Sequence, residues 1–449
     1  MKLSEKNTEE PQARHGVVTN EERLDGLTIL RFAHAFETGG GMERYLDDVD
    51  GALLARNAMT LIRVYLASDR NQLGERTESL GRGWLVRAPV ALPEGESLQL
   101  VSDREIPGKS WKHRFRDGVL YREPVWSLLT RFFLLRRPVQ RRSGQAVGAG
   151  AKVADLIKRY CVDLIVLHFM GGADSDEIVE QARLAGVPFV VANHYSNDRF
   201  MHLSIRKHAI LAAGVGGVNA LDVPKYVRDR FFNLSDGIDT EFFRCENTVC
   251  GADRSRPPQI ILPARIVRAK GQLDLVRAAG ILRRRGLDFK LAFAGRTDSE
   301  DFVRELREEI DRCGLGDRVE FAGALSVAEL REWYAASLVM AFPTYHHEGL
   351  PRIMMEAQAM KLPVVVYATG GVAEGLIPEK TGYLLKTGDI QGMAARLEEL
   401  LRQPGLRQQM GEAGRLFVEQ RFSLEALAKR HEEFYSGVLA KKRRAHSRS

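Results

Sequence analysis

The 449-residue chain contains only four cysteines, and they form neither a CxxC pair nor a disulfide framework. Cys245 and Cys250 lie close together, but a metal site there would need two further ligands that the sequence does not supply. We therefore interpret the cysteines as ordinary residues and expect a reducing compartment.

Long apolar runs are also absent. No segment approaches the ~18 consecutive apolar residues that a membrane-spanning helix needs. The first 25 residues have no apolar core, so we expect a disordered N-terminus over 1–25 and no signal peptide. These absences predict a cytoplasmic protein that is at most peripheral on the inner face of a membrane.

The charge balance excludes little. The formal net charge is +7, with 44% hydrophobic and 28% charged residues, which is typical of a globular domain. A moderate positive charge is compatible with a nucleotide, a polyanion or an anionic membrane surface and selects none of them.

Strand-like apolar runs alternate with helix-like amphipathic runs in both halves of the chain. The strands are expected at 27–36, 61–67, 163–169, 188–194, 259–264, 289–295, 318–323, 338–343 and 363–368. This alternation predicts an α/β protein with two doubly wound domains, in which ligands bind at the carboxyl ends of the strands.

A polar segment that breaks both periodicities, 233–258, separates the two halves. We expect an N-terminal domain over 26–235, a C-terminal domain over 236–420, a helix over 421–440 and a solvated basic tail over 441–449. An irregular basic insertion occupies about 70–148. Its segment 111–142, rich in Trp, Phe, Leu and Arg, is either a membrane-interfacial or acceptor-binding segment or a helical insertion that packs on its own domain.

Two acids, Glu348 and Glu356, are eight positions apart around Pro351, which suits the first position of a helix. Eight helical positions span about 12 Å, and the free N–H groups between the two acids can bind an anion. The pair could therefore hold the two ends of a sugar–diphosphate–ribose. It could equally be a pair of first-turn acids that suits the helix dipole.

Three other strand-end segments favour the ligand site. Arg265 and Lys270 follow the first strand of the C-terminal domain and suit a diphosphate. Glycines at 39–41 follow the first strand of the chain, but Arg44 breaks a dinucleotide G-x-G-x-x-G fingerprint, which disfavours a nicotinamide enzyme. His194 ends another strand and either faces the cleft or is structural. Because cations already compensate the charge, we expect no metal and no cofactor.

These residues, taken in order, resemble the retaining glycosyltransferases of family 4, also called group 1, which have the GT-B architecture of two Rossmann-like domains facing across a cleft. The resemblance covers nearly all of the C-terminal half and patches of the N-terminal half. The motifs that carry it are GGGMER, NHY, NLSDGIDTEFF, ARIVRAKG, FAGR, RVEFAGALSVAEL, EGLPRIMMEAQAMKLPVVV and ATGGVAEGLIPEKTGYLL.

The resemblance implies catalytic roles for four residues. Glu348 would contact the donor sugar, Arg265 and Lys270 would stabilise the leaving diphosphate, and His194 would line the cleft at the sugar. Donor-binding roles would fall to Glu356 at the ribose and to the loop and turn residues Gly349, Leu350, Pro351, Arg296, Gly40 and Gly41. The site lacks the Gly-rich EGFGLP form, and Ala373 stands where many relatives have proline, so the donor's sugar and base stay open.

The implied activity is transfer of a hexose from a UDP- or GDP-sugar, with retention, to a hydroxyl of a glycan or lipid-linked acceptor in envelope polysaccharide or glycolipid synthesis. It implies no nucleic-acid partner. Two alternatives stay open: a nucleotide-sugar epimerase on the same fold, and a non-catalytic protein that binds sugar nucleotides or polyanions.

Overall fold

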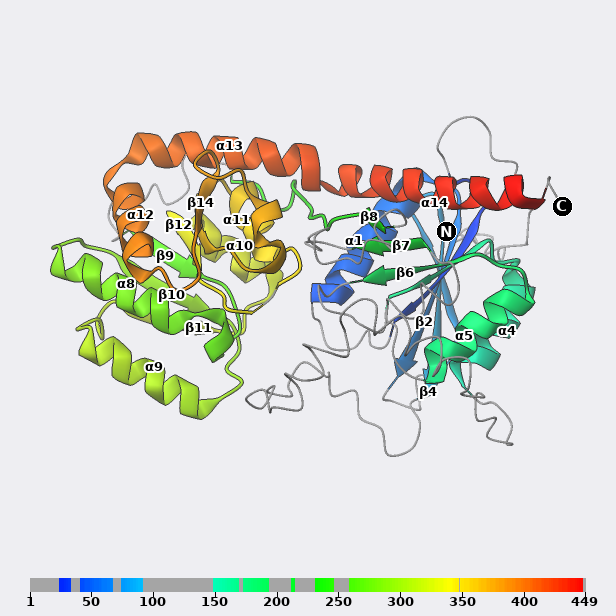
Figure 1. The fold of residues 1–449 in the computed structure, drawn as a ribbon, viewed down its shortest axis with the longest axis horizontal. Coiled ribbons are helices and arrows are strands. Elements are labelled where there is room, and N and C mark those ends of the chain that lie inside the picture. Colours follow the sequence, from blue (N-terminus) through cyan, green and yellow to red (C-terminus); the bar gives the residue numbers. More distant parts are fainter. Residues whose placement is uncertain are drawn as a thin grey trace, which may run out of the picture.

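The computed structural model describes residues 24–33, 41–67, 74–91, 148–168, 173–193, 211–214, 231–245, 258–346 and 348–446. Within these ranges two α/β domains lie side by side, and two long consecutive helices run along one edge of both (Figure 1). The predictions for 1–23, for the basic segment 111–142 and for 447–449 lie outside the described residues.

The N-terminal domain is built on a sheet whose described strands follow the order β3-β4-β2-β1-β5-β6-β7-β8, parallel except for β3 against β4. These strands are Thr28–Ala33 (β1), Thr60–Ala67 (β2), Arg76–Leu80 (β3), Gly83–Ala91 (β4), Leu164–Leu167 (β5), Phe189–Asn193 (β6), Leu211–Gly214 (β7) and Phe231–Asn233 (β8). Helices α4 (Ala149–Tyr160) and α5 (Ala173–Leu184) cover one face, and α1 (Gly41–Arg56) covers the other. Burial on both faces explains why β1 and β5 are apolar almost throughout.

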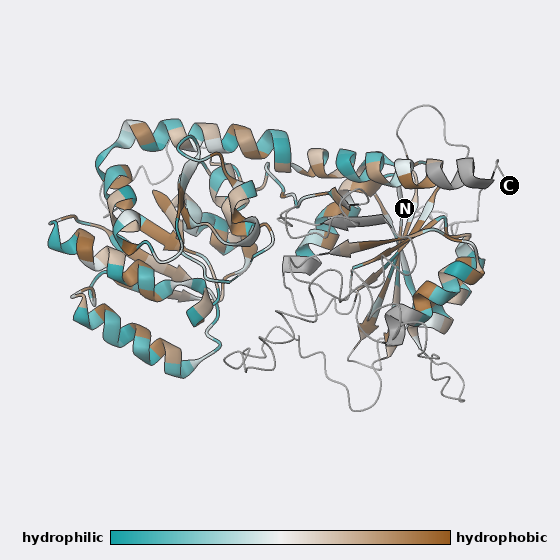
Figure 2. Ribbon diagram, viewed as in Figure 1, coloured by the Kyte–Doolittle hydropathy of each residue, from teal (hydrophilic) through white to brown (hydrophobic). Residues whose placement is uncertain are grey.

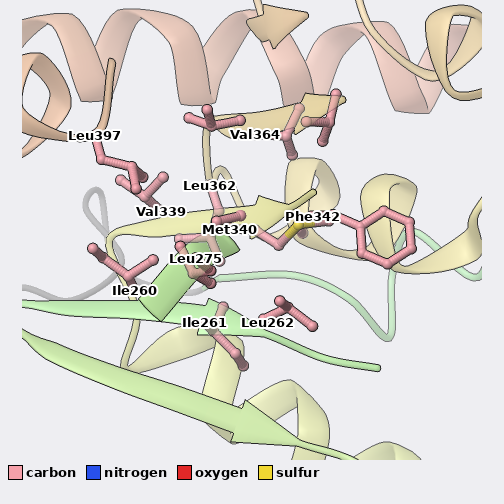
Figure 3. Close-up of a cluster of buried hydrophobic side chains, with 14 of the residues drawn as sticks. Ile260, Ile261, Leu262, Leu275, Val339, Met340, Phe342, Leu362, Val364 and Leu397 are labelled. Carbon is pink, nitrogen blue, oxygen red and sulfur yellow. The ribbon is translucent and has the colours of Figure 1, made fainter. Parts of the chain in front are cut away.

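The C-terminal domain has a parallel sheet in the order β11-β10-β9-β12-β13-β14. Its strands are Gln259–Leu262 (β9), Lys290–Ala294 (β10), Val319–Gly323 (β11), Val339–Phe342 (β12), Val364–Tyr367 (β13) and Gly382–Leu385 (β14). The helical segments are η4 (Arg268–Lys270), α8 (Gln272–Arg284), α9 (Glu300–Arg312), α10 (Val327–Ala335), α11 (Arg352–Ala359), η5 (Gly370–Gly375), α12 (Ile390–Arg402) and α13 (Pro404–Phe422). Figure 3 shows how side chains from β9, β12 and β13 meet Leu275 and Leu397 in the core, and Figure 2 shows the strands as the most apolar layer.

Every strand expected from the sequence is present, whereas the β3–β4 pair inside the irregular region was not predicted. Pro89 lies within β4, and a proline normally argues against a strand because it cannot donate to the ladder. Here β3 pairs only with Gly83–Arg87, so Pro89 lies beyond the antiparallel partner and needs bonds on one side alone.

The last helix, α14 (Leu424–His446), leaves the C-terminal domain at the end of α13 and packs on the N-terminal domain. Its buried Leu427, Ala428 and Tyr435 join the cluster formed with α1. The helix continues to His446, beyond residue 440, where the sequence pattern placed its end. The sequence AKKRRA at 440–445 consists of strong helix formers, which explains the extension.

Helix α1 is fixed to the sheet by a buried charge network. Arg31 on β1 and Arg63 on β2 are register partners and are fully buried. Both pair with Asp50 of α1, at 2.8 Å from Arg31 Nε and 2.5 Å from Arg63 Nε. The buried His168, a strand-end histidine, lies 3.2 Å from Arg31 Nη1 and is therefore part of this network. Two buried cations around one carboxylate hold α1 in one position, because breaking a buried pair costs about 3–5 kcal/mol.

One cysteine departs from expectation. Cys245, at the end of the connection into the C-terminal domain, is disulfide-bonded, so the prediction that the cysteines are ordinary residues is wrong for it. The spacing of cysteines in a sequence reveals a framework of several disulfides, whereas a single disulfide leaves no recognisable spacing pattern. Cys161 and Cys313 are free thiols.

Candidate active site

The loop after β9 and the loop after β12 meet at the carboxyl edge of the C-terminal sheet. The carbonyl of Ala269 accepts hydrogen bonds from the backbone N–H groups of Tyr345 at 2.8 Å and His346 at 3.2 Å. It also accepts one from the Thr344 hydroxyl at 3.2 Å. These bonds bring η4, which carries Lys270, against the loop that carries Glu348.

Lys270 and Glu348 form an ion pair in this corner. Both side chains are largely buried, and the Thr344 hydroxyl lies 3.3 Å from the same carboxylate oxygen. Burial by itself would raise the pKa of Glu348, but His346 and the Lys270 charge lower that pKa to about 2. The carboxylate is therefore ionised at any physiological pH and can accept hydrogen bonds from hydroxyl groups.

Gly271 makes the close approach of the two loops possible. Its φ is +77°, and a Cβ built on it would lie 1.9 Å from the carbonyl oxygen of Pro343 at the end of β12. Any side chain here would push η4 away from the Glu348 loop.

Two further predicted cations lie on the neighbouring strand ends and share one partner. Asp298 accepts from Arg265 Nη1 at 2.8 Å and pairs with Arg296 Nε at 2.9 Å. Gly295 allows the segments after β9 and β10 to approach each other closely, because a Cβ at position 295 would lie 2.1 Å from the carbonyl oxygen of Ala264. Both arginines stay partly exposed, so they can reach a bound anion while Asp298 orients them.

The start of α11 supplies free backbone donors beside these cations. The helix begins at Arg352, one residue later than expected, with Pro351 as an N-cap that provides no side-chain acceptor, and its first turn holds no acid. Its first N–H groups therefore remain available to an anion. Leu350 is buried next to Gly375 of η5, and the Glu348 carbonyl accepts a hydrogen bond from the Gly371 N–H. These contacts with η5 hold the segment 348–351, which includes Gly349, in place.

Glu356, the second acid of the motif, has a different environment from Glu348. It is fully buried, and its oxygens accept from Arg44 at 2.5 Å and from the Tyr334 hydroxyl at 3.1 Å. Burial, followed by the Glu356 charge, raises the pKa of Tyr334 well above its usual value. Arg44 belongs to α1 of the other domain, so Glu356 lies at the contact between the domains.

Other predicted site residues are only partly described. His194 and Gly40 lie outside the described residues, and Gly41 is the first residue of α1. Sequence reasoning missed His346, whose Nδ1 lies 3.6 Å from Glu348 Oε1 in an electrostatic contact, and also missed Asp298 and Arg44. His346 and Asp298 could have been suspected from their places in strand-end loops, whereas one sequence gives no sign that positions 44 and 356 meet.

The described ranges bear on metal binding and on membrane insertion. There, no group of three or more His, Cys, Asp or Glu side chains is placed to hold a metal ion. Nor does any helix in that part of the chain have the length and apolarity to cross a bilayer.

Comparison with known proteins connects this site to a family. Residues 251–417 match the family described as glycosyl transferases group 1. This segment of the C-terminal domain thus has the group 1 glycosyltransferase pattern. The matched segment contains Arg265, Lys270, Glu348 and Glu356, so the site built above is the part of this glycosyltransferase that carries the family pattern.

Sequence relatives of this glycosyltransferase match more than half of the chain. It is 28% identical over 297 residues, 61% of this chain and 76% of the relative, to a GDP-mannose-dependent α-(1-6)-phosphatidylinositol monomannoside mannosyltransferase of Mycobacterium tuberculosis. It is 27% identical over 237 residues, 52% of this chain and 60% of the relative, to the capsular polysaccharide biosynthesis glycosyltransferase CapM of Staphylococcus aureus.

Solved structures confirm the two-domain fold. A glycosyltransferase from Rickettsia africae superposes with a TM-score of 0.65 at 18% identity, covering 92% of this chain and 98% of that one. Anabaena HepE in complex with UDP gives a TM-score of 0.66 at 17% identity, covering 92% and 100%. The predicted GT-B fold is thereby confirmed.

Proposed function

We propose that this glycosyltransferase moves a hexose from a GDP- or UDP-sugar to a hydroxyl of a lipid-linked or glycan acceptor, with retention at the anomeric carbon. The observation that carries the proposal is the Lys270–Glu348 ion pair beside the uncapped start of α11. A carboxylate for sugar hydroxyls, a cation and free backbone donors for a diphosphate thus converge on one corner.

In the proposed reaction the acceptor oxygen bonds to the anomeric carbon while the bond from that carbon to the diphosphate oxygen breaks. The acceptor proton passes to the departing phosphate on the same face of the sugar. Arg265 and Lys270 stabilise the charge that develops on the leaving nucleoside diphosphate, and Glu348 orients the sugar. The protein's contribution is thus positioning and electrostatics, and activity should persist in EDTA.

GDP-mannose is the first donor to test, because a relative aligned over most of its own length is GDP-mannose-dependent. UDP-glucose is the second, because the structural neighbour HepE has been crystallised with UDP-glucose. A thermal-shift screen of both, followed by NMR of the product's anomeric configuration, would identify the donor and test retention. Product analysis with donor alone distinguishes transfer from epimerisation.

The acceptor is proposed to be an amphiphile or glycan at an anionic membrane surface. The net charge of +7 and the relatives named for a phosphatidylinositol mannoside and a capsular polysaccharide support this choice. Flotation with phosphatidylglycerol vesicles, compared with neutral phosphatidylcholine vesicles, tests it; failure to bind the anionic vesicles removes the membrane part of the proposal.

The catalytic assignment is tested by replacing both cations of the loop after β9. Arg265→Ala combined with Lys270→Ala should abolish turnover, because single electrostatic contacts of this kind are worth about 10²–10³ in kcat. Arg268→Ala is the matched control: it lies in the same loop, but it is exposed and pairs with Glu305. Turnover by the double variant at the rate of the Arg268 control would overturn the assignment.

A further inference from the structure

Helices α1 and α11, which belong to different domains, are joined by two reciprocal ion pairs. Arg44 and Asp48 are four residues apart on α1, and Arg352 and Glu356 are four residues apart on α11. Arg44 pairs with Glu356 at 2.5 Å, and Asp48 pairs with Arg352. Residues spaced by four share one helix face, so each helix presents one cation and one acid to the other. The order of the pairs sets the two faces antiparallel.

The double ion pair is largely removed from water. The side chains of Glu356, Arg352, Asp48 and Arg44 are 0%, 9%, 26% and 31% exposed. Removing Arg44 therefore leaves Glu356 as a buried carboxylate without its cation, which is far more damaging than the loss of a surface pair.

Arg352 also joins the chain connection between the domains to this contact. Its Nη1 donates to Asp236 at 2.8 Å and to the carbonyl of Gly237 at 2.9 Å. A cation in the first turn of a helix opposes the helix dipole, so its position is unfavourable for α11 alone. Two carboxylates, Asp48 and Asp236, offset that cost only when the domains are together.

The contact lies next to the loop that carries Glu348. Helix α1 begins at Gly41, at the end of the glycine-rich segment, and α11 begins directly after the loop that carries Glu348. We propose that Arg44 is a positioning residue for donor binding: it holds the Glu356 carboxylate, and with the Asp48–Arg352 pair it fixes helix α1 against α11, the helix that follows the donor loop. This role rests on the proposed function, in which Glu356 belongs to the donor site.

A double-mutant cycle between Arg44 and Glu356 tests the role. Arg44→Met should raise the KM for the nucleotide sugar and lower kcat/KM at least tenfold, and Arg44→Lys should recover part of the loss. In Arg44→Met/Glu356→Gln the loss should be no larger than in Glu356→Gln alone, because Arg44 acts through Glu356. The double variant should also melt at a higher temperature than Arg44→Met, since it buries no unpaired charge.

The matched control is Arg87→Met, which removes an arginine of similar exposure that pairs with Glu78 inside the N-terminal domain. It should leave KM and kcat unchanged. The positioning role would be overturned if the losses of kcat/KM in the two single variants multiplied in the double variant. It would also be overturned if Arg87→Met lost as much kcat/KM as Arg44→Met.

A donor-free measurement separates this inference from the proposed function. In small-angle X-ray scattering without nucleotide, Arg44→Met/Asp48→Asn should have a larger radius of gyration than wild type and Arg87→Met. An unchanged radius overturns the interdomain contact whatever the enzyme binds. A further outcome is the expected increase in radius while wild type binds neither GDP-mannose nor UDP-glucose. That combination would overturn the proposed donors and the donor role of Arg44, but it would confirm the interdomain contact.

Discussion

At the residue scale, the charge of Glu348 depends on two neighbours, His346 and Lys270. Burial favours the neutral acid, whereas Lys270, together with His346, lowers the pKa of Glu348 to about 2 from an ordinary value of 4.5. When the Lys270 charge is removed, less opposes the effect of burial, so the pKa of Glu348 rises. The ionised form is the one that accepts hydrogen bonds from sugar hydroxyls.

We therefore expect Lys270→Gln to introduce a pH dependence into donor binding. Wild type should bind the nucleotide sugar equally at pH 5 and pH 8, because Glu348 is ionised at both. The variant should bind more weakly at pH 5 than at pH 8, because protonation of Glu348 removes an acceptor. Calorimetric titration at the two pH values measures this, with Lys270→Arg as the control that keeps the charge; equal affinities in Lys270→Gln would contradict it.

A second titrating residue, His431 on α14, is tied to stability. It is fully buried, accepts from the Tyr45 hydroxyl at 2.9 Å, and donates through Nδ1 to the Leu427 carbonyl. Burial, and then the charge of Arg31, lower its pKa to about 3 from 6.5. The unfolded chain therefore binds the proton more readily than the folded chain. This histidine's contribution is complete above about pH 6.5 and is lost as the pH falls toward 3.

Replacing His431 by Gln should flatten the acid side of the stability curve. Between pH 6.5 and 5 wild type loses up to about 1.4 kcal/mol per pH unit from this group, and the variant does not. The variant is less stable at pH 7, and the gap narrows at pH 5. Urea unfolding at pH 7, 6 and 5 tests this; a gap of constant size would show that folding does not lower the pKa of His431.

The site residues that the sequence revealed share one property. Arg265, Lys270 and Glu348 lie in the segments that follow apolar strands, and parallel topology brings strand ends together whatever the loops contain. Arg44 was not predicted as a site residue because its partner, Glu356, lies 312 positions away in the other domain. Only the relative placement of the two domains brings these residues into contact. Periodicity within one domain carries no information about that placement.

At the element scale, the loop after β9 depends on a glycine whose role can be isolated. Gly271 and Gly286 both have φ of +77°, but a Cβ at 271 would meet the Pro343 carbonyl at 1.9 Å, whereas a Cβ at 286 has nothing within 4 Å. The pair thus separates backbone strain from steric contact.

Gly286→Ala should cost about 1–2 kcal/mol of stability, the penalty for an L-residue in the left-handed region, and leave donor binding unchanged. Gly271→Ala should cost more and should also weaken donor binding, because η4 and Lys270 must move away from Glu348. Chemical unfolding and nucleotide-sugar titration measure both effects. Equal losses of stability and unchanged binding in both variants would contradict a steric role for position 271.

Elements were predictable where one physical pattern dominated. Unbroken apolar runs such as β12 and β13 identify buried parallel strands, and the 3.6-residue stripe of α1 was visible as Tyr45, Leu46, Val49 and Leu53. Strand β4 was missed because Gly83 at its start and Pro89 within it obscure the strand pattern, and only its place beside the short β3 makes a proline acceptable there. That place follows from tertiary pairing.

At the scale of the whole molecule, the chain passes between the domains at two neighbouring points. The connection after β8 and the junction of α13 with α14 lie side by side, since Ile238 donates to the Phe422 carbonyl at 2.8 Å. Arg430 of α14 spans both points. It donates to the carbonyls of Leu234 at 2.8 Å, Arg421 at 2.6 Å and Asp236 at 3.2 Å. One guanidinium thus fixes the hinge about which any domain closure must occur.

Arg430→Ala should uncouple the two domains. It leaves three carbonyls without their donor, at a cost of about 1–3 kcal/mol for each that stays buried. Differential scanning calorimetry should then resolve two transitions where wild type shows one. Arg407→Ala is the matched control, because Arg407 also donates to two carbonyls, Leu400 and Leu401, but within a single domain. That control should lower the midpoint without splitting the transition. A single transition in Arg430→Ala, lowered as in the control, would mean that the interdomain ion pairs of α1 and α11 hold the domains together without help from the hinge.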